Sequence, residues 1–323
     1  MVLFIIKRFY SYNGYEQISN GLRTSATFVV DMLKMEGHRA KLVEAIDGNC
    51  IDRLVTEFRP RICILEALWV TPLKLKELRR LHPSVEFVVR IHSEMPFLAN
   101  EGISMEWLSE YLKSGVKVAF NSRQAKQDFE AIGESLYLPN SYPLRKMRYE
   151  HKRGNSLHVG CFGAVRPLKN QLEQALGAIL YARSTGKTLH FHMNGTRKEQ
   201  GGDNNLKSIK AAVEATGNKL ILHGWLDHEA FLEVIKEMDF CLQVSLSESF
   251  NIVAADAVSL GVPLIGSAAI RWLPKRSRAV TDSAQAIAQK MHLADHTTAL
   301  MNHEALESYV ENSIEVWNSF ATL

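Results

Sequence analysis

Short apolar runs alternate along the chain with longer segments in which apolar residues recur at helical spacing. The runs expected to form strands are 2–6, 61–65, 86–91, 116–120, 157–162, 188–193, 219–222, 240–244 and 262–265. The segments expected to form helices are 18–35, 71–81, 104–114, 122–132, 168–183, 204–216, 227–237, 249–260, 283–292 and 303–319. Continuous apolar strands are typical of buried parallel sheets, and the strand–helix alternation predicts an α/β fold.

The alternation is interrupted once, between residues 139 and 155. This stretch holds two prolines, a glycine and five basic residues, a composition typical of a linker. We therefore predict two tandem Rossmann-like domains that face each other across a cleft. Ligands of such open sheets bind beyond the carboxyl ends of the strands. The predicted division is residues 1–140, a basic linker 141–155, residues 156–300, and a C-terminal helix 301–323 that could pack back on the first domain.

Composition excludes several classes of protein. The chain has 323 residues, of which 46% are apolar and 23% charged, so a largely disordered chain is not expected. The four cysteines form no CxxC pair, and three of them lie in strand-like runs, which favours buried thiols in a reducing compartment. The apolar run at the N-terminus is too short for a signal peptide, and residues 252–270 are interrupted by Asp, Gly and Pro. We expect a cytoplasmic protein without a transmembrane segment.

Residues 240–267 carry most of the functional information. A strand leads into a Ser-rich turn and then a helix predicted to begin at about Ser249 and to end at Gly261. The free N–H groups at Ser249, Phe250 and Asn251 would make an anion site suited to a diphosphate. Glu248 stands beside that site, where a carboxylate suits sugar hydroxyls better than phosphate. Asp256 lies among alanines within the helix and needs hydrogen-bond donors, such as ribose hydroxyls, unless it lies on a solvated edge.

This segment resembles the signature of the retaining GT-B glycosyltransferases of the family-4 type. The family's pattern is a Ser, a Glu, a Phe-Gly pair, a second Glu eight positions after the first, then small residues and a Gly-x-Pro. The matching positions here are Ser245, Glu248, Phe250, Asp256, Gly261 and Pro263. Four other segments, in the family's order, extend the resemblance over about residues 60–267: 86–94, 116–129, 136–144 and the glycine, Pro and Lys loop 160–170.

The resemblance implies a nucleotide-diphosphate sugar, of the UDP or GDP type, as the donor substrate, with no further cofactor. It implies that Gly163, Arg166 and Lys169 grip the diphosphate, and that Ser249, Phe250, Asn251 and Asp256 complete the donor site. His92, at a strand end of the first domain, and Glu248 would contact the donor sugar. The chain contains no DxD pair, so no metal site is predicted. Basic residues would neutralise the leaving group, and the sugar would be transferred with retention.

Several positions depart from the family pattern. Asp256 is one methylene shorter than the usual Glu, and Ser249 and Asn251 stand where glycines are usual. Ala164 stands where the family usually has an Arg, and Arg166 follows two residues later. The loop 8–23, which includes four aromatic residues, lacks the usual glycine pair. His190 and His192 share one strand face and are interpreted as a buried pair rather than a zinc site.

The acceptor is left open by the sequence. A glycosyltransferase acting on an envelope glycan or another hydroxyl acceptor is the leading hypothesis. One alternative is a phage-type enzyme acting on hydroxymethylated bases in DNA, and another is a catalytically silent GT-B-like module. The net charge of +3 is small, and basic stretches are usually solvated loops. The basic residues that could hold DNA phosphates are Arg145, Lys146, Arg148, Arg271, Lys275, Arg276 and Arg278.

Overall fold

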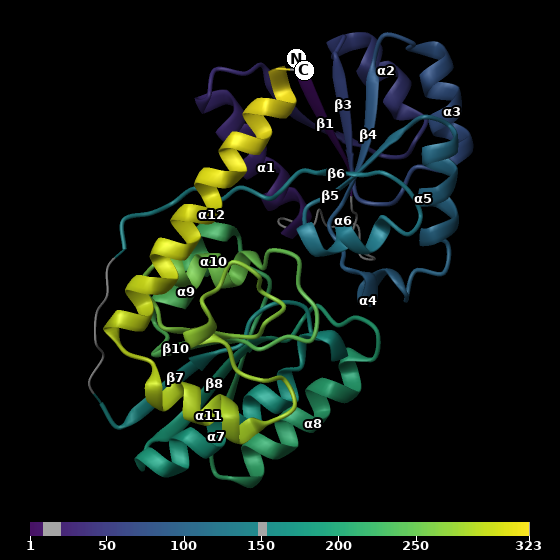
Figure 1. Ribbon diagram of the computed structural model, residues 1–323. Coiled ribbons are helices and arrows are strands. Elements are labelled where there is room, and N and C mark those ends of the chain that lie inside the picture. The colour runs from purple at the N-terminus through teal and green to yellow at the C-terminus, as the bar shows by residue number, and fades with distance from the viewer. Residues whose placement is uncertain (9–20, 148–153, 323) are drawn as a thin grey trace. The chain divides into compact units, whose positions relative to one another are not determined.

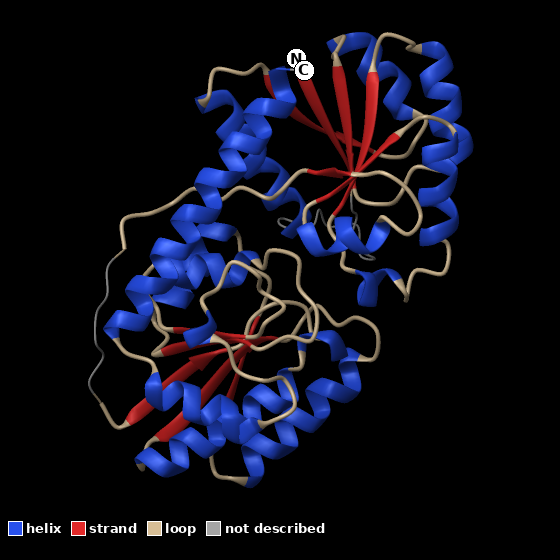
Figure 2. Ribbon diagram, viewed as in Figure 1, coloured by secondary structure: helices blue, strands red, loops and turns tan. Residues whose placement is uncertain are grey.

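The computed structural model describes residues 1–8, 21–147 and 154–322 and divides the chain into two compact units. Unit 1 comprises Met1–Pro143 and Val310–Leu323, and unit 2 comprises Leu144–Tyr309. Both are α/β units with a parallel sheet (Figures 1 and 2). The aromatic loop singled out from the sequence, Phe9, Tyr10, Tyr12 and Tyr15, lies outside the described residues.

Unit 1 contains a six-stranded parallel sheet in the order β2-β1-β3-β4-β5-β6. Its strands are β1 Val2–Lys7, β2 Ala40–Ala45, β3 Ile62–Glu66, β4 Glu86–Ile91, β5 Lys117–Phe120 and β6 Leu136–Tyr137. Its helices are α1 Gly21–Met35, α2 Cys50–Phe58, α3 Pro72–Leu81, α4 Met95–Leu98, α5 Ser104–Lys113 and α6 Arg123–Phe129. The four strands expected in this half are confirmed, whereas β2, β6, α2 and the short α4 were not predicted.

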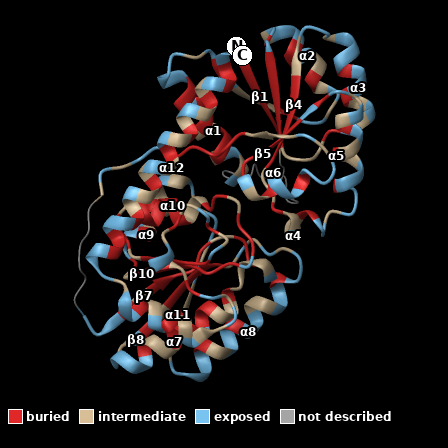
Figure 3. Ribbon diagram, viewed as in Figure 1, coloured by how far each residue is buried: buried red, intermediate tan, exposed pale blue. Residues whose placement is uncertain are grey.

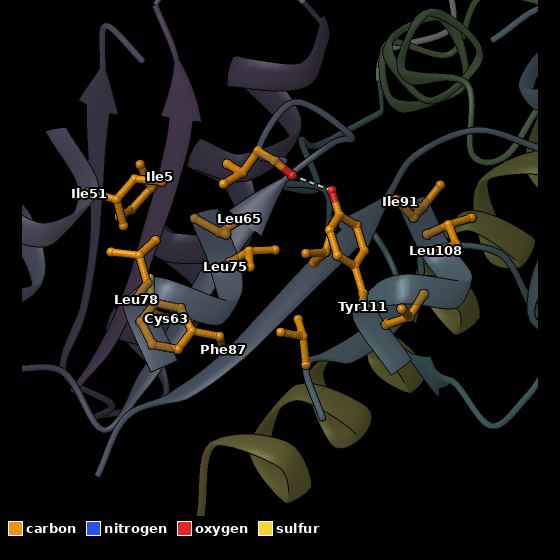
Figure 4. Packing of buried hydrophobic residues seen from close by; sticks show 14 of the residues in the cluster. Ile5, Ile51, Cys63, Leu65, Leu75, Leu78, Phe87, Ile91, Leu108 and Tyr111 are labelled. Atoms are coloured by element: carbon orange, nitrogen blue, oxygen red, sulfur yellow. Dashed lines mark hydrogen bonds between the residues drawn. The ribbon is translucent and has the colours of Figure 1, made fainter. Parts of the chain in front are cut away.

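The core of unit 1 lies on both faces of this sheet. Ile5, Leu65 and Ile91 come from three neighbouring strands and are buried in one cluster with residues of helices α3 and α5 (Figure 4). Figure 3 colours strands of this sheet as buried. The Tyr111 hydroxyl in this view donates to the backbone carbonyl of Val70. Its hydrogen bond lets a large ring fill the core without leaving a buried donor unpaired.

The opposite face of the same sheet is covered in part by the end of the last helix, α12 His296–Thr322. Trp317 is fully buried in this cluster, with its ring 5.6 Å from that of Phe4. The indole Nε1–H of Trp317 donates to the Pro139 carbonyl at 2.8 Å. Residues from Val310 onward therefore belong to unit 1, although they follow unit 2 in the chain.

Unit 2 contains a five-stranded parallel sheet in the order β11-β10-β7-β8-β9. Its strands are β7 Ser156–Gly160, β8 Thr188–Asn194, β9 Lys219–His223, β10 Phe240–Gln243 and β11 Leu264–Gly266. Its helical elements are η1 Pro167–Lys169, α7 Gln171–Thr185, α8 Gly202–Ala215, α9 His228–Lys236, α10 Ile252–Ser259, η2 Lys275–Ser277, α11 Ala284–Leu293 and the first part of α12. The five strands predicted here are confirmed, and Asp227 caps α9 as expected.

The strand order locates the ligand-binding edge of each sheet. In unit 2 the order reverses between β7 and β10, and in unit 1 between β1 and β3. Open α/β sheets bind ligands outside the carboxyl ends of the strands at such a switch point. In unit 2 the loop 161–170 and the Ser-rich turn 244–251 leave these two strands, so both predicted donor segments share one switch point. Among the described helices, none is long and apolar enough to cross a membrane.

Candidate functional site

The loop after β7 is shaped by a glycine and closed by a short 3₁₀ turn. Gly163 adopts φ +114°, a conformation that side-chain-bearing residues rarely adopt. Its N–H donates to Asn194 Oδ1 at 2.8 Å, and a Cβ built there would lie 3.6 Å from Lys169 Cε. The η1 turn brings Lys169 back over this glycine. The loop therefore places an ammonium group beside the Gly163 backbone at the switch point.

Buried amide side chains fix this loop to the neighbouring strand. Gln174 donates to the Lys169 carbonyl at 2.7 Å and accepts from the Val244 N–H at 2.8 Å. Asn170 donates to the Val244 carbonyl at 3.1 Å. Since Gln174 is almost fully buried, its bonds form in a low-dielectric environment where they hold the loop firmly. The backbone that carries Lys169 is thus tied to the end of β10.

Lys169 and Glu248 form an ion pair at the centre of this arrangement. Lys169 Nζ lies 2.5 Å from Glu248 Oε1, and the side chains are only 11% and 7% exposed. Sequence positions 79 residues apart are brought together by the β7–β10 adjacency. A charge pair with so little exposure pays a desolvation cost and is weak evidence for stability alone. Its place at the switch point instead favours a role in ligand binding.

Arg166 lies in the same loop but its side chain is engaged elsewhere. Its guanidinium Nη1 contacts Glu199 Oε2 at 3.1 Å, and Arg197 shares the same carboxylate. Burial favours the neutral form of Glu199, but Arg197 and Arg166 outweigh it and lower its pKa. The Arg166 N–H in turn donates to Gln171 Oε1 at 3.3 Å. The structure thus brings Gly163, Lys169 and Glu248 together, with Arg166 in a neighbouring ion-pair cluster.

The helix after the Ser-rich turn begins three residues later than predicted. It starts at Ile252, and Asn251 is its N-cap, accepting from the Ala254 N–H at 2.9 Å. The N–H groups of Ser249, Phe250 and Asn251 therefore belong to the turn and not to the helix. Asn251 has φ 65°, and Asn is the residue other than Gly that best tolerates this left-handed conformation. This explains how Asn251 can stand at a position where the family pattern has a glycine.

The Phe250 side chain packs into the core beneath the turn and does not line the site. Its ring is fully buried, 4.9 Å from the Tyr309 ring and 6.0 Å from the Trp272 ring. Its carbonyl accepts from Trp272 Nε1 at 2.8 Å. Ser249, just before it, is half-buried. The buried aromatic side chain thus holds in place the turn that carries Glu248.

Asp256 is buried in α10 and bound to a histidine of α9. Its Oδ1 accepts from His228 Nε2 at 2.8 Å, and its side chain is 1% exposed, against 20% for His228. The hydrogen bond to Asp256 raises the pKa of His228 despite the opposing effect of burial. The solvated-edge interpretation of Asp256 is therefore wrong. The accessible group at this position is the imidazole.

In unit 1, His92 follows β4 and belongs to a network of polar side chains at the carboxyl edge of the sheet. Its Nε2 contacts the Glu66 carboxylate, which also pairs with Arg90 at 3.1 Å. Its Nδ1 lies 3.4 Å from Asn121 Nδ2. Asn140 Oδ1 accepts from both Arg90 and Asn121, at 2.7 and 3.2 Å. Of this network, only His92 was predicted from the sequence.

The residues that were missed share a recognisable position. Glu66 ends β3, and Asn121 directly follows β5. Polar residues at the carboxyl ends of successive parallel strands meet at one edge, and this spacing is visible in the sequence. The amides Gln171, Gln174 and Gln243 offer no such signal, because a glutamine inside a helix or strand usually faces solvent.

Four histidines on β7, β8 and β9 form a further polar cluster in unit 2. His192 Nε2 is 3.0 Å from His158 Nδ1, and His192 Nδ1 is 2.9 Å from His223 Nε2. His190 lies beside His158, with ring centroids 4.6 Å apart. The predicted pair is therefore part of a larger group. No set of three or more potential metal ligands occurs among the residues that the structure describes.

Several of the basic residues named for DNA binding are held by intramolecular contacts. Arg145 pairs with Glu229 at 2.6 Å, and Arg276 with Asp295 at 3.3 Å. Arg278 donates to the backbone carbonyls of Leu273 and Arg271. The remaining side chains of the set are exposed at the surface, namely Lys146, Arg271 and Lys275. Arg148 lies outside the described residues.

Comparison with known proteins gives a family match for unit 2. Residues 156–295 match the family of Glycosyl transferases group 1. This match covers the two loops of the switch point, with Gly163, Lys169 and Glu248. No curated protein sequence matches the chain. The predicted enzyme class, a glycosyltransferase, is confirmed at the level of this domain.

Solved structures resemble the whole chain at low sequence identity. The apo structure of OtsA superimposes with a TM-score of 0.70 at 11% identity, covering 100% of this chain and 99% of OtsA. Anabaena Alr3699/HepE, solved in complex with UDP and glucose, gives 0.67 at 13% identity and covers 100% of both chains. A UDP-forming α,α-trehalose-phosphate synthase from Burkholderia vietnamiensis gives 0.67 at 10% identity, covering 99% and 96%. The GT-B fold is thereby confirmed.

Proposed function

We propose that this chain transfers a sugar from a nucleotide-diphosphate sugar to a hydroxyl acceptor, with retention and without a metal ion. The observation that carries the proposal is the Lys169–Glu248 ion pair beside the Gly163 backbone, at the switch point of unit 2. Such a site offers one cation for phosphate and one carboxylate for hydroxyls.

The diphosphate of the donor would bind Lys169 and the backbone around Gly163. In the ligand-free site the Lys169 ammonium is paired with Glu248. An incoming diphosphate carries more negative charge than one carboxylate and would take over the ammonium group. Glu248 would then be able to accept hydrogen bonds from sugar hydroxyls. Preorganised positive charge at a leaving group is usually the largest catalytic term.

The chemical step that fits the family-4 resemblance is a front-face displacement. The acceptor hydroxyl oxygen bonds to the anomeric carbon as the bond from that carbon to the phosphate oxygen breaks. The acceptor proton passes to the departing phosphate oxygen, so no enzymatic nucleophile is needed. His92 is proposed to hydrogen-bond a hydroxyl of the donor sugar. The uridine diphosphate named in the HepE and trehalose-phosphate synthase structures makes a UDP-sugar the first donor to test.

The proposal is tested by following nucleotide diphosphate release from a panel of UDP- and GDP-sugars in EDTA. One donor is expected to be consumed by the wild type without added metal. Lys169→Met should lower turnover by about 100-fold or more, the usual effect of removing one charge-stabilising group. Glu248→Gln should lower turnover while leaving the affinity for the free nucleotide diphosphate largely unchanged.

Lys198→Met is the matched control, because Lys198 belongs to the same unit but pairs with Asp203 at the surface. It should retain wild-type turnover. Binding of a nucleotide without any sugar transfer or hydrolysis would identify a silent module instead. A requirement for magnesium would contradict the metal-independent form of the proposal.

A further inference from the structure

A fully buried ion pair stands behind His92 in unit 1. Glu66, at the end of β3, and Arg90, in β4, are both 0% exposed and lie 3.1 Å apart. Neither side chain can touch a ligand at the surface. Replacing such a pair by apolar residues is often neutral or stabilising, so fold stability alone is a weak explanation for keeping it. Among the described residues, the partly accessible group that the pair contacts is His92, which is 15% exposed.

Arg90 is saturated by acceptors that surround it. Its Nε donates to the Leu138 carbonyl at 2.8 Å, and its Nη2 donates to the Pro139 carbonyl at 2.8 Å and to Asn140 Oδ1 at 2.7 Å. Its Nη1 donates to both oxygens of Glu66 at 3.1 Å. These bonds use all five guanidinium donors. Nη1 also lies 3.2 Å from His92 Nε2, farther from that nitrogen than the Glu66 carboxylate oxygen is. Arg90 therefore fixes the Glu66 carboxylate in place beside the imidazole.

The carboxylate determines which imidazole nitrogen carries the proton. An ionised carboxylate only accepts hydrogen bonds, so a His92 Nε2 in contact with Glu66 Oε2 must be the protonated nitrogen. The other tautomer would place two lone pairs against each other in a buried site. On the far side of the ring, Nδ1 faces the donor Nδ2 of Asn121 at 3.4 Å. An amide donor there also requires Nδ1 to be the acceptor.

The charges of the site favour this neutral form. Burial would raise the pKa of Glu66, but Arg90 and His92 outweigh it and lower that pKa. Burial and Arg90 lower the pKa of His92, against the opposing effect of Glu66. One carboxylate and one guanidinium already balance, and a protonated ring would leave a net buried charge.

We propose that Glu66, held by Arg90, is a positioning residue that keeps the proton of His92 on Nε2 and thereby presents Nδ1 as a hydrogen-bond acceptor for a substrate hydroxyl. The 3.4 Å contact with Asn121 is long for a hydrogen bond, so a hydroxyl can replace it at little cost. This inference rests on the proposed function for the identity of the hydroxyl, but its structural part does not. Specificity would then favour a sugar with a hydroxyl, and not a bare ether or methyl group, at the contacted carbon.

The first test is the tautomer of His92 in the wild-type protein, measured by long-range ¹H–¹⁵N NMR at pH 7.5 and assigned with His92→Asn. The expected spectrum has a protonated-type shift at Nε2 and an unprotonated-type shift at Nδ1. A ring protonated on Nδ1, or on both nitrogens, would overturn the proposal. This readout needs neither a donor nor an acceptor, and no variant other than the assignment control.

The second test is kinetic and uses Glu66→Gln. This substitution keeps the shape of the side chain but replaces a carboxylate, which only accepts hydrogen bonds, by an amide that can also donate. Turnover of the nucleotide sugar is expected to fall on the order of 10- to 100-fold, as for carboxylates that orient histidines elsewhere. The dissociation constant for the free nucleotide diphosphate should stay within about twofold, because unit 2 carries that site. The ¹⁵N spectrum of this variant should show a mixture of tautomers.

The matched control is Asp52→Asn, because Asp52 also contacts a histidine in unit 1, His82, at 2.7 Å. It should leave turnover unchanged. If Glu66→Gln folds and retains wild-type turnover with the Nε2 tautomer intact, Glu66 is not the positioning residue. If instead the wild type binds no nucleotide and consumes no donor, the proposed function fails while the tautomer measurement still decides the positioning role.

Discussion

Single residues in the site have a structural reason that a family pattern alone does not reveal. Asn251 adopts φ 65°, caps α10 and donates to Gln243 Oε1 at 2.8 Å. It therefore adopts the left-handed conformation expected of the glycine and adds a side-chain hydrogen bond to the helix start that glycine cannot make. The departure from the family pattern at this position is an alternative solution to the same turn.

This interpretation predicts which of two substitutions at Asn251 lowers the stability of the protein more. Asn251→Ala should lower the free energy of unfolding by about 2–3 kcal/mol, through the lost cap and the left-handed conformation. Asn251→Gly should cost about half of that or less, because glycine tolerates the conformation and is itself an acceptable cap residue. Urea unfolding of both variants measures the order. An alanine variant more stable than the glycine variant would contradict the account, because alanine stabilises relative to glycine only where the backbone is not in the left-handed conformation.

A second prediction at this scale concerns the His228–Asp256 pair. Because the folded protein raises the pKa of His228, the pair stabilises the fold fully below the unfolded value near 6.5. This stabilisation is lost as the pH rises through the folded pKa. Asp256→Asn should therefore cost more stability at pH 5.5 than at pH 8.5, and NMR titration should show a lower pKa for His228. An equal cost at both pH values would show that the pair is not charge-coupled.

At the scale of elements, strands were predicted more reliably than the starts of helices. β4 matches its predicted bounds, because a buried apolar run flanked by polar residues has little freedom. The start of α10 was placed three residues too early, because the Ser-rich turn offers several capping residues and only the conformation of Asn251 decides between them. β2 was missed because it is not a continuous apolar run: it contains Lys41 and Glu44, and only its two end residues are buried.

The part of the candidate site that lies in recognisable sequence motifs could be predicted from the sequence. Lys169 and Glu248 lie in motifs that a resemblance can locate, and the structure joins them. The pairing of Glu66 with Arg90 could not be assigned from sequence, because neither a strand-end position nor a charge within an apolar strand identifies the partner. Their pairing follows from the alignment of β3 with β4, in which Glu66 lies opposite Arg90.

The histidine cluster of β7, β8 and β9 yields a prediction for the stability of unit 2. Burial, followed by neighbouring histidines, lowers the pKa of His192 to about 3. A lowered pKa means that the unfolded chain takes up this proton first, so stability falls as the pH drops below about 6.5. His192→Gln removes the titrating ring, and its stability should decline less between pH 7.5 and pH 5 than that of the wild type. Chemical denaturation at each pH measures this decline. If the stabilities of the wild type and the variant fall in parallel, His192 is not the cause of the pH dependence.

At the scale of the whole molecule, the chain builds two cores and returns to the first one at its end. Trp317 comes from the last helix, yet it is fully buried against β1 and hydrogen-bonded to Pro139. Arg90 lies over the same indole ring, 5.4 Å from its centroid. The C-terminal helix therefore supports the sheet edge that carries His92.

Removing the buried Trp317 side chain should destabilise unit 1 and leave unit 2 largely unaffected. Trp317→Ala is expected to cost about 3–5 kcal/mol, the usual range for emptying a buried aromatic site. Hydrogen exchange should show lower protection in β1 and β3 and unchanged protection in β7 and β8. Trp225→Ala, at a partly exposed position of unit 2, should change stability by less than about 1 kcal/mol. Equal losses in the two sheets would contradict the assignment of α12 to the core of unit 1.

The measurement that tests the central claim most directly is a calorimetric titration of UDP and GDP into the wild type and Lys169→Met, in EDTA and in magnesium. The account predicts that one of the two nucleotides binds the wild type with the same affinity in both buffers. It predicts at least about tenfold weaker binding by Lys169→Met, since a charged hydrogen bond contributes roughly 1.5–3 kcal/mol. Binding that needs magnesium, or that is unaffected by the loss of Lys169, would contradict a metal-independent nucleotide-sugar site at the switch point of unit 2.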